Sequence, residues 1–402
     1  MKPSSATFVF AGGGTGGHLF PGIAVAEELR RRLPAARMLF VGTERDVERR
    51  ILIDAGFEHV ALSSPPSTWI RRKPLRFVTR YWAARRAAGS LLADRQPIAA
   101  IGLGGFASIP VVMAASRLGI PIVLLEQNAV AGRATQWLAR RADVVCHSYA
   151  DAVPDRRLTA NAVVTGNPVR RAVAQLATHP NITAVNAHPR AHARDQQTLL
   201  VLGGSQGSAA VNDAVLRAAE QLCGEFAGWR IIHQCGPHDR DRLAAGYGRL
   251  DIAHEIAPFF ADLPQRYALA DVVVSRAGAT TLAELACTGL PAVLIPYPDS
   301  VRDHQRLNAE VFARTGGAVV VEQHRHPDRT GRELTVALRS LLTEPVERAK
   351  RSTAMRSLAR PPAAAEVAQR ILHVAGIMPA APMPPHFART APERVSHFED
   401  SH

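Results

Sequence analysis

Two glycine-rich turns, each directly after a short apolar run, constrain the fold of this chain more than any other feature. The first turn is residues 12–17, after the run 8–11, and the second is residues 203–207, after the run 199–202. A buried strand that runs into glycines lets backbone N–H groups approach an anion, and the following helix points its positive end at that anion. Two such turns, about half a chain apart, predict two nucleotide-type domains facing one cleft and a ligand with two phosphates.

Short apolar runs alternate with helical stretches along the chain. Further strands are expected at residues 37–41, 98–103, 121–125, 143–147, 198–202, 229–234, 271–275, 292–296 and 318–321. This alternation is typical of parallel sheets covered by helices on both faces. We therefore predict an α/β protein with two Rossmann-like domains, an N-terminal one at 1–168 and a C-terminal one at 169–360.

Three segments fall outside these two domains or divide them. Residues 177–197 contain two His-Pro pairs and no strand-like run, which predicts a linker or a mobile loop. Residues 361–376 are expected to form a last helix. Residues 377–402 carry prolines, charges and histidines without periodicity, so we expect a disordered tail.

The composition fits a cytosolic enzyme. The chain has 402 residues and 47% hydrophobic content, enough to bury the cores of two or three domains. Its four cysteines are scattered and form no C-x-x-C pair, which argues against disulfides and zinc. The start of the chain leaves no room for a signal peptide, and the most apolar stretch, 98–125, is broken by prolines, glycines and an arginine. We expect neither secretion nor a transmembrane helix.

The net charge of +13 predicts an anionic partner, and one segment concentrates it. Residues 67–93 hold seven basic residues and no acidic one, interleaved with aromatic and aliphatic residues. This pattern is typical of an anchor at an anionic membrane surface. The alternative is a solvated amphipathic helix whose aromatic residues face the core. Nucleic acid is not an expected partner, because no recognition motif accompanies the charge.

His18 stands out beside the first turn. That turn formally contains G-x-G-x-x-G, but a dinucleotide-binding enzyme also needs an acidic residue at the tip of the second strand, which here ends in Gly42-Thr43. We interpret His18 as a functional residue. The alternative is a histidine that caps or packs the loop.

A third group of motifs lies at further expected strand ends. Residues 275–284, Ser-Arg-Ala-Gly-Ala-Thr-Thr-Leu-Ala-Glu, open a helix whose first turn can bind phosphate, with Glu284 one turn deeper to hold two ribose hydroxyls. The alternative is that Thr280 or Thr281 caps its own helix and Glu284 lies on the surface. The glycine-rich residues 104–110 also follow a strand, and ligands of open parallel sheets bind at such ends.

Seven motifs in a fixed order resemble those of the MurG family, the peptidoglycan N-acetylglucosaminyltransferases that convert lipid I to lipid II. The resemblance covers roughly residues 7–375. The motifs are Gly-Gly-Thr-Gly-Gly-His (13–18) with Pro21-Gly22, Gly-Gly-Phe-Ala-Ser-Ile-Pro (104–110), Glu-Gln-Asn (126–128), Gly-Asn-Pro-Val-Arg (166–170), Gly-Gly-Ser-Gln-Gly (203–207), the 275–284 motif, and Asp-His-Gln (303–305) with Asn308-Ala309.

The resemblance implies a GT-B glycosyltransferase fold, with UDP-N-acetylglucosamine held mainly by the C-terminal domain and the lipid acceptor by the N-terminal one. It implies that Ser205 and Thr281 contact the donor phosphates, that Glu284 binds the ribose, and that Phe260 reads the uracil through its backbone. The full substrate-binding set it implies is Thr15, Gly16, Gly17, Asn128, Arg170, Ser205, Phe260, Ala279, Thr280, Thr281, Leu282, Ala283, Glu284 and Gln305.

The implied reaction is an inverting displacement by the 4-hydroxyl of the acceptor sugar, with His18 as the candidate base. A role for His18 in orienting a phosphate or the acceptor stays open. No metal and no cofactor are expected, and we discount Asp239-Arg240-Asp241 as a metal site. Two departures from the family pattern matter. Leu125 stands where the family often has histidine, and the irregular loop 297–302 leaves open whether His304 or Gln305 contacts the sugar.

The resemblance places the protein at the cytoplasmic face of the cell membrane as a peripheral protein, and it leaves cell-wall synthesis proteins open as partners. Three other functions stay open at this stage. They are a related transferase that glycosylates diacylglycerol, a nicotinamide-dependent oxidoreductase, and a sugar-nucleotide-binding scaffold without activity.

Overall fold

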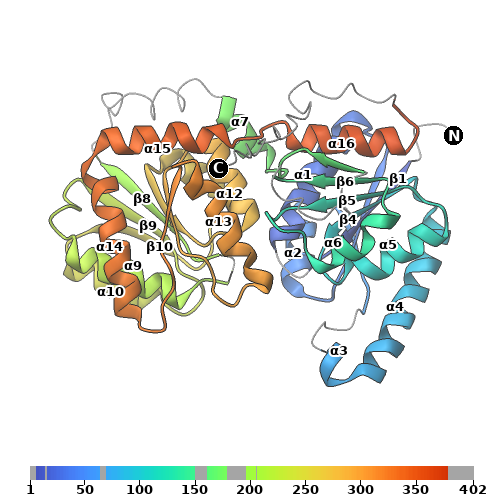
Figure 1. Ribbon diagram of the computed structural model, residues 1–402, viewed down its shortest axis with the longest axis horizontal. Helices are drawn as coiled ribbons and strands as arrows, with labels where there is room; N and C mark the ends of the chain where they lie inside the picture. Colours follow the sequence, from blue (N-terminus) through green and yellow to red (C-terminus); the bar gives the residue numbers. More distant parts are fainter. Residues whose placement is uncertain are drawn as a thin grey trace, which may run out of the picture.

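Two α/β lobes lie side by side in the protein (Figure 1). The computed structural model describes residues 6–13, 16–63, 69–149, 161–178, 196–204 and 206–378. Each lobe is built on a sheet in which every recorded strand pair is parallel. This is the predicted fold class.

The N-terminal lobe has a seven-stranded sheet in the order β3-β2-β1-β4-β5-β6-β7. Its strands are β1 (Thr7–Gly12), β2 (Arg37–Gly42), β3 (Glu58–Ala61), β4 (Ala99–Gly104), β5 (Ile122–Glu126), β6 (Val144–His147) and β7 (Ala162–Val164). Its helices are α1 (Gly16–Arg32), α2 (Asp46–Asp54), α3 (Trp69–Arg72), α4 (Pro74–Arg95), α5 (Ser108–Arg117), α6 (Arg133–Leu138) and the short 3-10 helix η2 (Ala139–Arg141).

The C-terminal lobe has a six-stranded sheet in the order β10-β9-β8-β11-β12-β13. Its strands are β8 (Gln197–Leu202), β9 (Trp229–Gln234), β10 (Ala253–Ala257), β11 (Val272–Ser275), β12 (Ala292–Leu294) and β13 (Ala318–Val320). The helices that follow β7 are α7 (Arg171–Thr178), α9 (Ala209–Gln221), α10 (Arg240–Arg249), α11 (Leu263–Leu269), α12 (Ala279–Thr288), η5 (Val301–Asp303), α13 (His304–Arg314), α14 (Pro327–Thr343), α15 (Pro345–Ser357) and α16 (Ala363–Val374).

Both faces of each sheet are buried, which is why the central strands are continuous apolar runs. Successive side chains of a strand point to opposite faces. In β1, Phe8 and Phe10 belong to one core cluster and Val9 to another. In β8, Leu199 and Leu200 are divided in the same way between two clusters.

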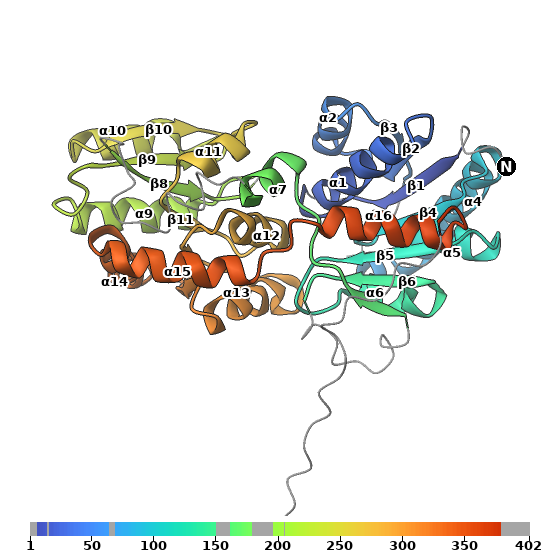
Figure 2. The ribbon, with the colours of Figure 1, turned by 90° about the horizontal axis from the view of Figure 1, so that it is seen from above.

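The end of the chain crosses back to the first lobe. Helix α15 lies along the C-terminal lobe and α16 along the N-terminal lobe (Figure 2). Val367, Ala368, Ile371 and Leu372 of α16 are buried in the same cluster as Phe8. The last helix therefore completes the core of the N-terminal lobe, which the sequence did not predict.

The described strands confirm the predicted ones to within two residues at each end, and three strands are additional. These are β3, β7 and β10, all at sheet edges. The predicted linker at 177–197 lies largely outside the described residues: α7 ends at Thr178 and β8 begins at Gln197. The predicted tail lies outside them from residue 379 onward.

Candidate active site in the cleft between the lobes

A cavity of about 940 Å³ lies between the two lobes, lined by residues of both. It is formed where the carboxyl ends of β1, β5, β8, β9 and β11 run into loops, as in other open parallel sheets. This volume is suited to a ligand of sugar-nucleotide size. The predicted site residues that line it are Gly16, Gly17, His18, Asn128, Arg170, Phe260, Ala279, Thr280, Thr281, Glu284 and Gln305.

Four members of the predicted set are placed differently or lie outside the described residues. Thr15 and Ser205 are not among the described residues. Leu282 is fully buried in the core of the C-terminal lobe, and Ala283 packs against the same core. Neither side chain reaches the cleft, because α12 turns both of them away from it.

The turn after β8 is held against the turn after β9 by close backbone contact. Gly207 has a φ of +72°, and a Cβ atom there would lie 2.5 Å from the Cys235 carbonyl oxygen. Gly236 on the opposite side is equally tight, since its Cβ would lie 2.7 Å from the Gly207 Cα. These two glycines bring the start of α9 close to the end of β9.

A comparison of Gly207→Ala with Gly204→Ala tests this packing. Both glycines have positive φ, but a Cβ on Gly204 meets no described atom within 4 Å. Gly204→Ala should therefore cost only the left-handed strain, about 1 kcal/mol. Gly207→Ala should lower the free energy of unfolding by about 3 kcal/mol or more, because a steric clash is added. Denaturant unfolding measures both, and equal losses would contradict the close packing.

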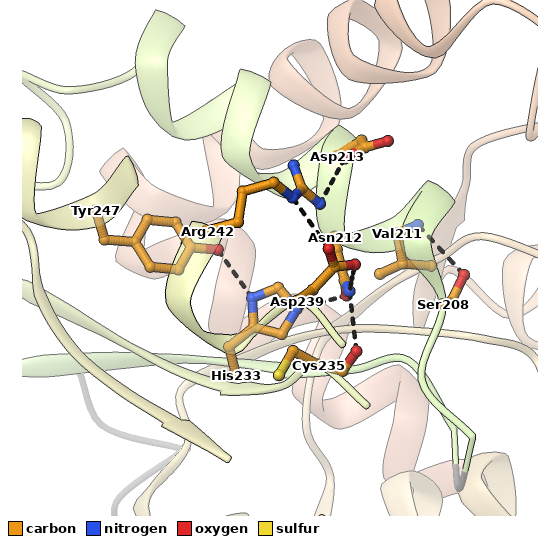
Figure 3. A network of polar contacts seen from close by, with 9 residues as sticks. All are labelled: Ser208, Val211, Asn212, Asp213, His233, Cys235, Asp239, Arg242 and Tyr247. Atoms are coloured by element: carbon orange, nitrogen blue, oxygen red, sulfur yellow. Dashed lines mark hydrogen bonds and ion pairs between the residues drawn. The ribbon is translucent and has the colours of Figure 1, made fainter. Parts of the chain in front are cut away.

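A buried polar network lies behind this turn (Figure 3). Asn212 of α9 donates from Nδ2 to the Cys235 carbonyl oxygen at 2.9 Å and to Asp239 Oδ2 at 2.7 Å. Its Oδ1 therefore accepts from His233 Nε2 at 3.0 Å, and His233 Nδ1 accepts from the Tyr247 hydroxyl at 2.8 Å. Burial lowers the pKa of His233 to about 3, so the ring is neutral. The network fixes α9 to β9 with its polar atoms satisfied.

Arg276 supplies positive charge on the C-terminal side of the cleft. Its guanidinium donates to the carbonyl oxygen of Ile295, to Ser208 Oγ at 2.7 Å and to Gln323 Oε1 at 2.6 Å. Among the described residues no carboxylate is paired with it. Burial lowers its pKa to about 10, which still leaves it charged at neutral pH. An unneutralised cation between the starts of α9 and α12 favours an anionic ligand.

Glu284 is held by two partners on the floor of the cleft. Arg170 donates from Nε to Oε1 at 2.7 Å and from Nη2 to Oε2 at 2.9 Å, and the Tyr267 hydroxyl donates to Oε2 at 2.9 Å. Burial alone would lower the pKa of Arg170, but the Glu284 carboxylate outweighs it and raises that pKa. Because each carboxylate oxygen accepts about two hydrogen bonds, Oε1 keeps one position for a ligand hydroxyl. A second hydroxyl would have to replace Arg170 or Tyr267.

Several hydrogen bonds join the lobes across the cleft. Thr280 Oγ1 donates to the Gly17 carbonyl oxygen at 2.9 Å, so this hydroxyl does not cap its own helix. Asn308 Oδ1 accepts from the Ala129 amide at 2.7 Å, and Asn308 Nδ2 donates to Asn128 Oδ1 at 3.2 Å. The predicted residues Thr280 and Asn128 thus lie where the two domains meet.

The remaining predicted residues lie around the same cavity. The Phe260 amide donates to Gln234 Oε1 at 3.1 Å, so a ligand would meet the backbone of Phe260 at its carbonyl oxygen. Gln305 Oε1 accepts from the Tyr297 amide at 2.9 Å, while His304 Nδ1 lies 2.8 Å from the Val301 carbonyl oxygen. Both His304 and Gln305 line the cleft.

His18 lies near the start of α1 and is half-buried against the glycine turn after β4. Its Nδ1 atom is 3.0 Å from Gln127 Oε1. It is on the N-terminal side of the cleft, opposite the start of α12. This placement lets it act on a group that enters between the lobes.

The chain was compared with known proteins. Residues 8–147 match the model of the glycosyltransferase family 28 N-terminal domain, and residues 198–368 match that of the family 28 C-terminal domain. A UDP-N-acetylglucosamine--N-acetylmuramyl-(pentapeptide) pyrophosphoryl-undecaprenol N-acetylglucosamine transferase of Syntrophus aciditrophicus is 37% identical over 341 residues, which is 84% of this chain and 90% of the relative. The chain belongs to the MurG family. It is therefore a glycosyltransferase of family 28.

Two further comparisons agree with this family. The enzyme of the same name from Pelobacter propionicus is 40% identical over 324 residues, 76% of this chain and 84% of the relative. The crystal structure of Acinetobacter baumannii MurG superimposes with a TM-score of 0.69 at 30% identity, covering 91% of this chain and 99% of that one. The two lobes of this MurG-family chain have the GT-B arrangement.

Some cleft residues of this MurG-family chain had no predicted role. Gln127 and Arg276 belong to motifs of the family resemblance, so the sequence indicated that both lie near the site. It did not indicate their contacts, because these are made with residues far away in the sequence. Gln234 ends β9, and its Nε2 donates to the Gly204 carbonyl oxygen at 2.9 Å. The feature of the sequence that could have identified Gln234 as a site residue is its position at the carboxyl end of a central strand.

The structure also bears on the discounted metal motif. Asp239 accepts hydrogen bonds from Asn212 and Arg242 and belongs to the buried network. Within the described ranges, no group of three or more histidine, cysteine, aspartate or glutamate side chains is arranged to hold a metal ion.

Proposed function

We propose that this MurG-family enzyme transfers N-acetylglucosamine from UDP-N-acetylglucosamine to the 4-hydroxyl of the N-acetylmuramyl sugar of lipid I, which gives lipid II for peptidoglycan synthesis. The observation that carries the proposal is the cavity between the lobes, which combines the family's motifs from both domains in one site. Relatives over most of the chain carry this activity in their names.

The donor diphosphate would bind on the C-terminal side of the cleft. The starts of α9 and α12 both border the cavity, and helix N-termini favour anions. Arg276 adds a cation between them. Negative charge grows on the diphosphate as the sugar leaves, so these groups stabilise the transition state more than the bound substrate. Thr281 would contact a phosphate and Glu284 the ribose.

The acceptor would enter from the N-terminal side, where His18 is the proposed base. As the acceptor oxygen forms its bond to the anomeric carbon, His18 takes the hydroxyl proton. The bond from that carbon to the UDP oxygen breaks, and its electron pair leaves with UDP. Attack from the side opposite the leaving group inverts the anomeric configuration. The backbone of Gly16 and Gly17 would line this half of the cleft.

Measurement of UDP release with different acceptors tests the proposed reaction. We expect fast release with a lipid I analogue, and at most slow release with diacylglycerol or with no acceptor. Fast release with diacylglycerol alone would point to the related lipid glycosyltransferase. A change in nicotinamide absorbance would point to an oxidoreductase, and UDP-N-acetylglucosamine binding without release under all conditions would indicate a scaffold.

We also propose that the protein docks on the anionic cytoplasmic face of the membrane through α3 and α4. These helices project beyond the rest of the N-terminal lobe (Figure 1). Leu75, Val78 and Trp82 are 82%, 49% and 53% exposed, and their i, i+3, i+7 spacing puts them on one face of α4. No helix in the described part of the chain is long and apolar enough to span a bilayer.

The rest of the segment divides between surface and core. Exposed basic side chains accompany the apolar face, namely Arg72, Lys73, Arg76, Arg80 and Arg86. In contrast, Arg85 is buried, and Phe77 and Tyr81 are half-buried against the lobe. Some aromatic residues of this segment therefore face the core, as the alternative interpretation expects, while Trp82 lies on the outer face, where the proposed docking requires it.

Vesicle binding tests this docking surface. Replacing Arg72, Lys73 and Arg76 with serine should reduce co-sedimentation with anionic vesicles, since each basic residue contributes about 1 kcal/mol of attraction. High salt should weaken wild-type binding without abolishing it, because burial of apolar residues is not screened. UDP binding in solution should stay unchanged. The control replaces Arg314 and Lys350, which lie on the other lobe, with serine, and this variant should co-sediment like the wild-type protein. Wild-type co-sedimentation of the triple variant would mean that docking occurs elsewhere.

A further inference from the structure

One contact in the cleft joins His18 to a buried amide. Gln127 follows β5 and is 2% exposed. Its Nε2 atom donates to the Leu103 carbonyl oxygen at 3.0 Å, and its Oε1 atom lies 3.0 Å from His18 Nδ1. The side chain thus bridges the end of β4 to the start of α1.

The chemistry of these atoms fixes where the protons are. The Leu103 carbonyl can only accept a hydrogen bond, so the NH2 group of Gln127 must face it. The amide oxygen of Gln127 then faces His18 and can only accept, so His18 Nδ1 must carry a proton. In a neutral imidazole the other nitrogen, Nε2, then holds the free lone pair.

The surroundings of the ring leave Nε2 available on the cleft side. The ring packs against Gly104 and Gly105, whose φ values are +95° and +73°. A Cβ atom on Gly104 would lie 3.2 Å from the Cε1 and Nδ1 atoms of His18. Within the described ranges, Nε2 has no hydrogen-bond partner of its own, while His18 lines the cavity.

We infer that Gln127 is a positioning residue that selects the Nδ1–H tautomer of His18 and so leaves the Nε2 lone pair free to accept the acceptor's hydroxyl proton. In the reaction, Nε2 gains the proton while Nδ1–H stays bonded to Gln127, and the resulting imidazolium keeps that hydrogen bond. The inference rests on the proposed role of His18 as base, but the tautomer is measurable without any reaction.

The direct test is the ring nitrogen spectrum of the full chain labelled with 15N-histidine. The His18 signal is identified by its loss in His18→Gln. We expect a protonated Nδ1 and an unprotonated Nε2 at a pH where the ring is neutral. In Gln127→Met, which removes the acceptor, Nδ1 should no longer be the dominant protonated nitrogen. An Nε2–H tautomer in the wild-type protein would overturn the inference, whatever the activity.

Kinetics supply a second readout with a matched control. Gln127→Met should lower kcat about a hundredfold, as expected when a base is held in the wrong tautomer, and should change the donor KM less than twofold. Gln127→Glu in its protonated form keeps both contacts, with its hydroxyl donating to the Leu103 carbonyl and its carbonyl oxygen accepting from Nδ1, and it should recover about tenfold of the loss. Gln136→Met is the control, since Gln136 also donates to a backbone carbonyl in the same lobe but does not line the cleft.

The two proposals fail in different ways. If Gln127→Met keeps the Nδ1–H tautomer and normal kcat, the positioning role of Gln127 is wrong. A loss seen equally in Gln127→Met and Gln127→Glu, with the tautomer unchanged in both, would mean that Gln127 acts only by supporting the fold. If the wild-type tautomer is Nδ1–H but His18→Ala turns over normally, the tautomer assignment stands and the proposed base is wrong.

Discussion

Replacing His18 with alanine is expected to lower kcat by about 10²- to 10⁴-fold, the contribution typical of a general base. UDP affinity should stay close to that of the wild-type enzyme, because the groups proposed to bind UDP lie on the other lobe. Steady-state kinetics with a lipid I analogue and a separate UDP titration measure the two effects. A change in kcat without a change in binding is the mark of a group that acts in the transition state.

His254→Ala is the control for this experiment. His254 is in the edge strand β10, and its Nδ1 atom contacts the Ile252 carbonyl oxygen at 2.8 Å, away from the cleft. Its replacement should leave kcat unchanged. Near-normal turnover of His18→Ala, or a loss confined to UDP binding, would contradict the assignment of His18 as the base.

The second large effect is expected at Glu284. Glu284→Ala removes the proposed charge-assisted hydrogen bond to the ribose, worth about 1.5–3 kcal/mol, so UDP affinity should fall by about tenfold or more. It also leaves Arg170 and the Tyr267 hydroxyl without their acceptor. Because Glu284 is 2% exposed, the variant should lose thermal stability as well.

Two further variants separate binding from folding. Glu284→Gln keeps the shape and an acceptor for Arg170, so it should recover stability but only part of the UDP affinity. Glu310→Ala removes a half-buried glutamate of α13 that is paired with Arg306, and it should change neither property. Isothermal titration with UDP and thermal unfolding measure the two effects. Unchanged UDP binding in a folded Glu284→Ala protein would show that the ribose assignment is wrong.

The central strands were predictable because parallel strands buried on both faces must be continuous apolar runs. Two of the three additional strands, β3 and β10, lack this pattern. In β3, Glu58-His59-Val60-Ala61, no residue is fully buried, and β10 begins with three exposed residues. Both are edge strands, where one side of the backbone has no partner and burial does not dictate the side chains.

The sequence predicted which motifs form the site, but it did not predict most of the contacts between their side chains. The glycine turns and the 275–284 motif identified the cleft, since ligands bind where strands end. The pairing of Glu284 with Arg170 spans 114 residues, and no local pattern encodes it. The packing of α16 on the first lobe could not be predicted either, because the apolar face of a helix shows that it is buried but does not indicate which sheet it packs against.

The most direct test of the proposed reaction follows the sugar itself. The full chain is incubated with a lipid I analogue and UDP-N-acetylglucosamine carrying a label in the sugar, and labelled lipid and free UDP are measured together. We expect one sugar to appear on the lipid for each UDP released, in a β linkage opposite to the configuration in the donor. With His18→Ala, the initial rate of labelling should be at most about a hundredth of the wild-type rate. UDP release without labelled lipid, or transfer with retained configuration, would contradict the proposed reaction.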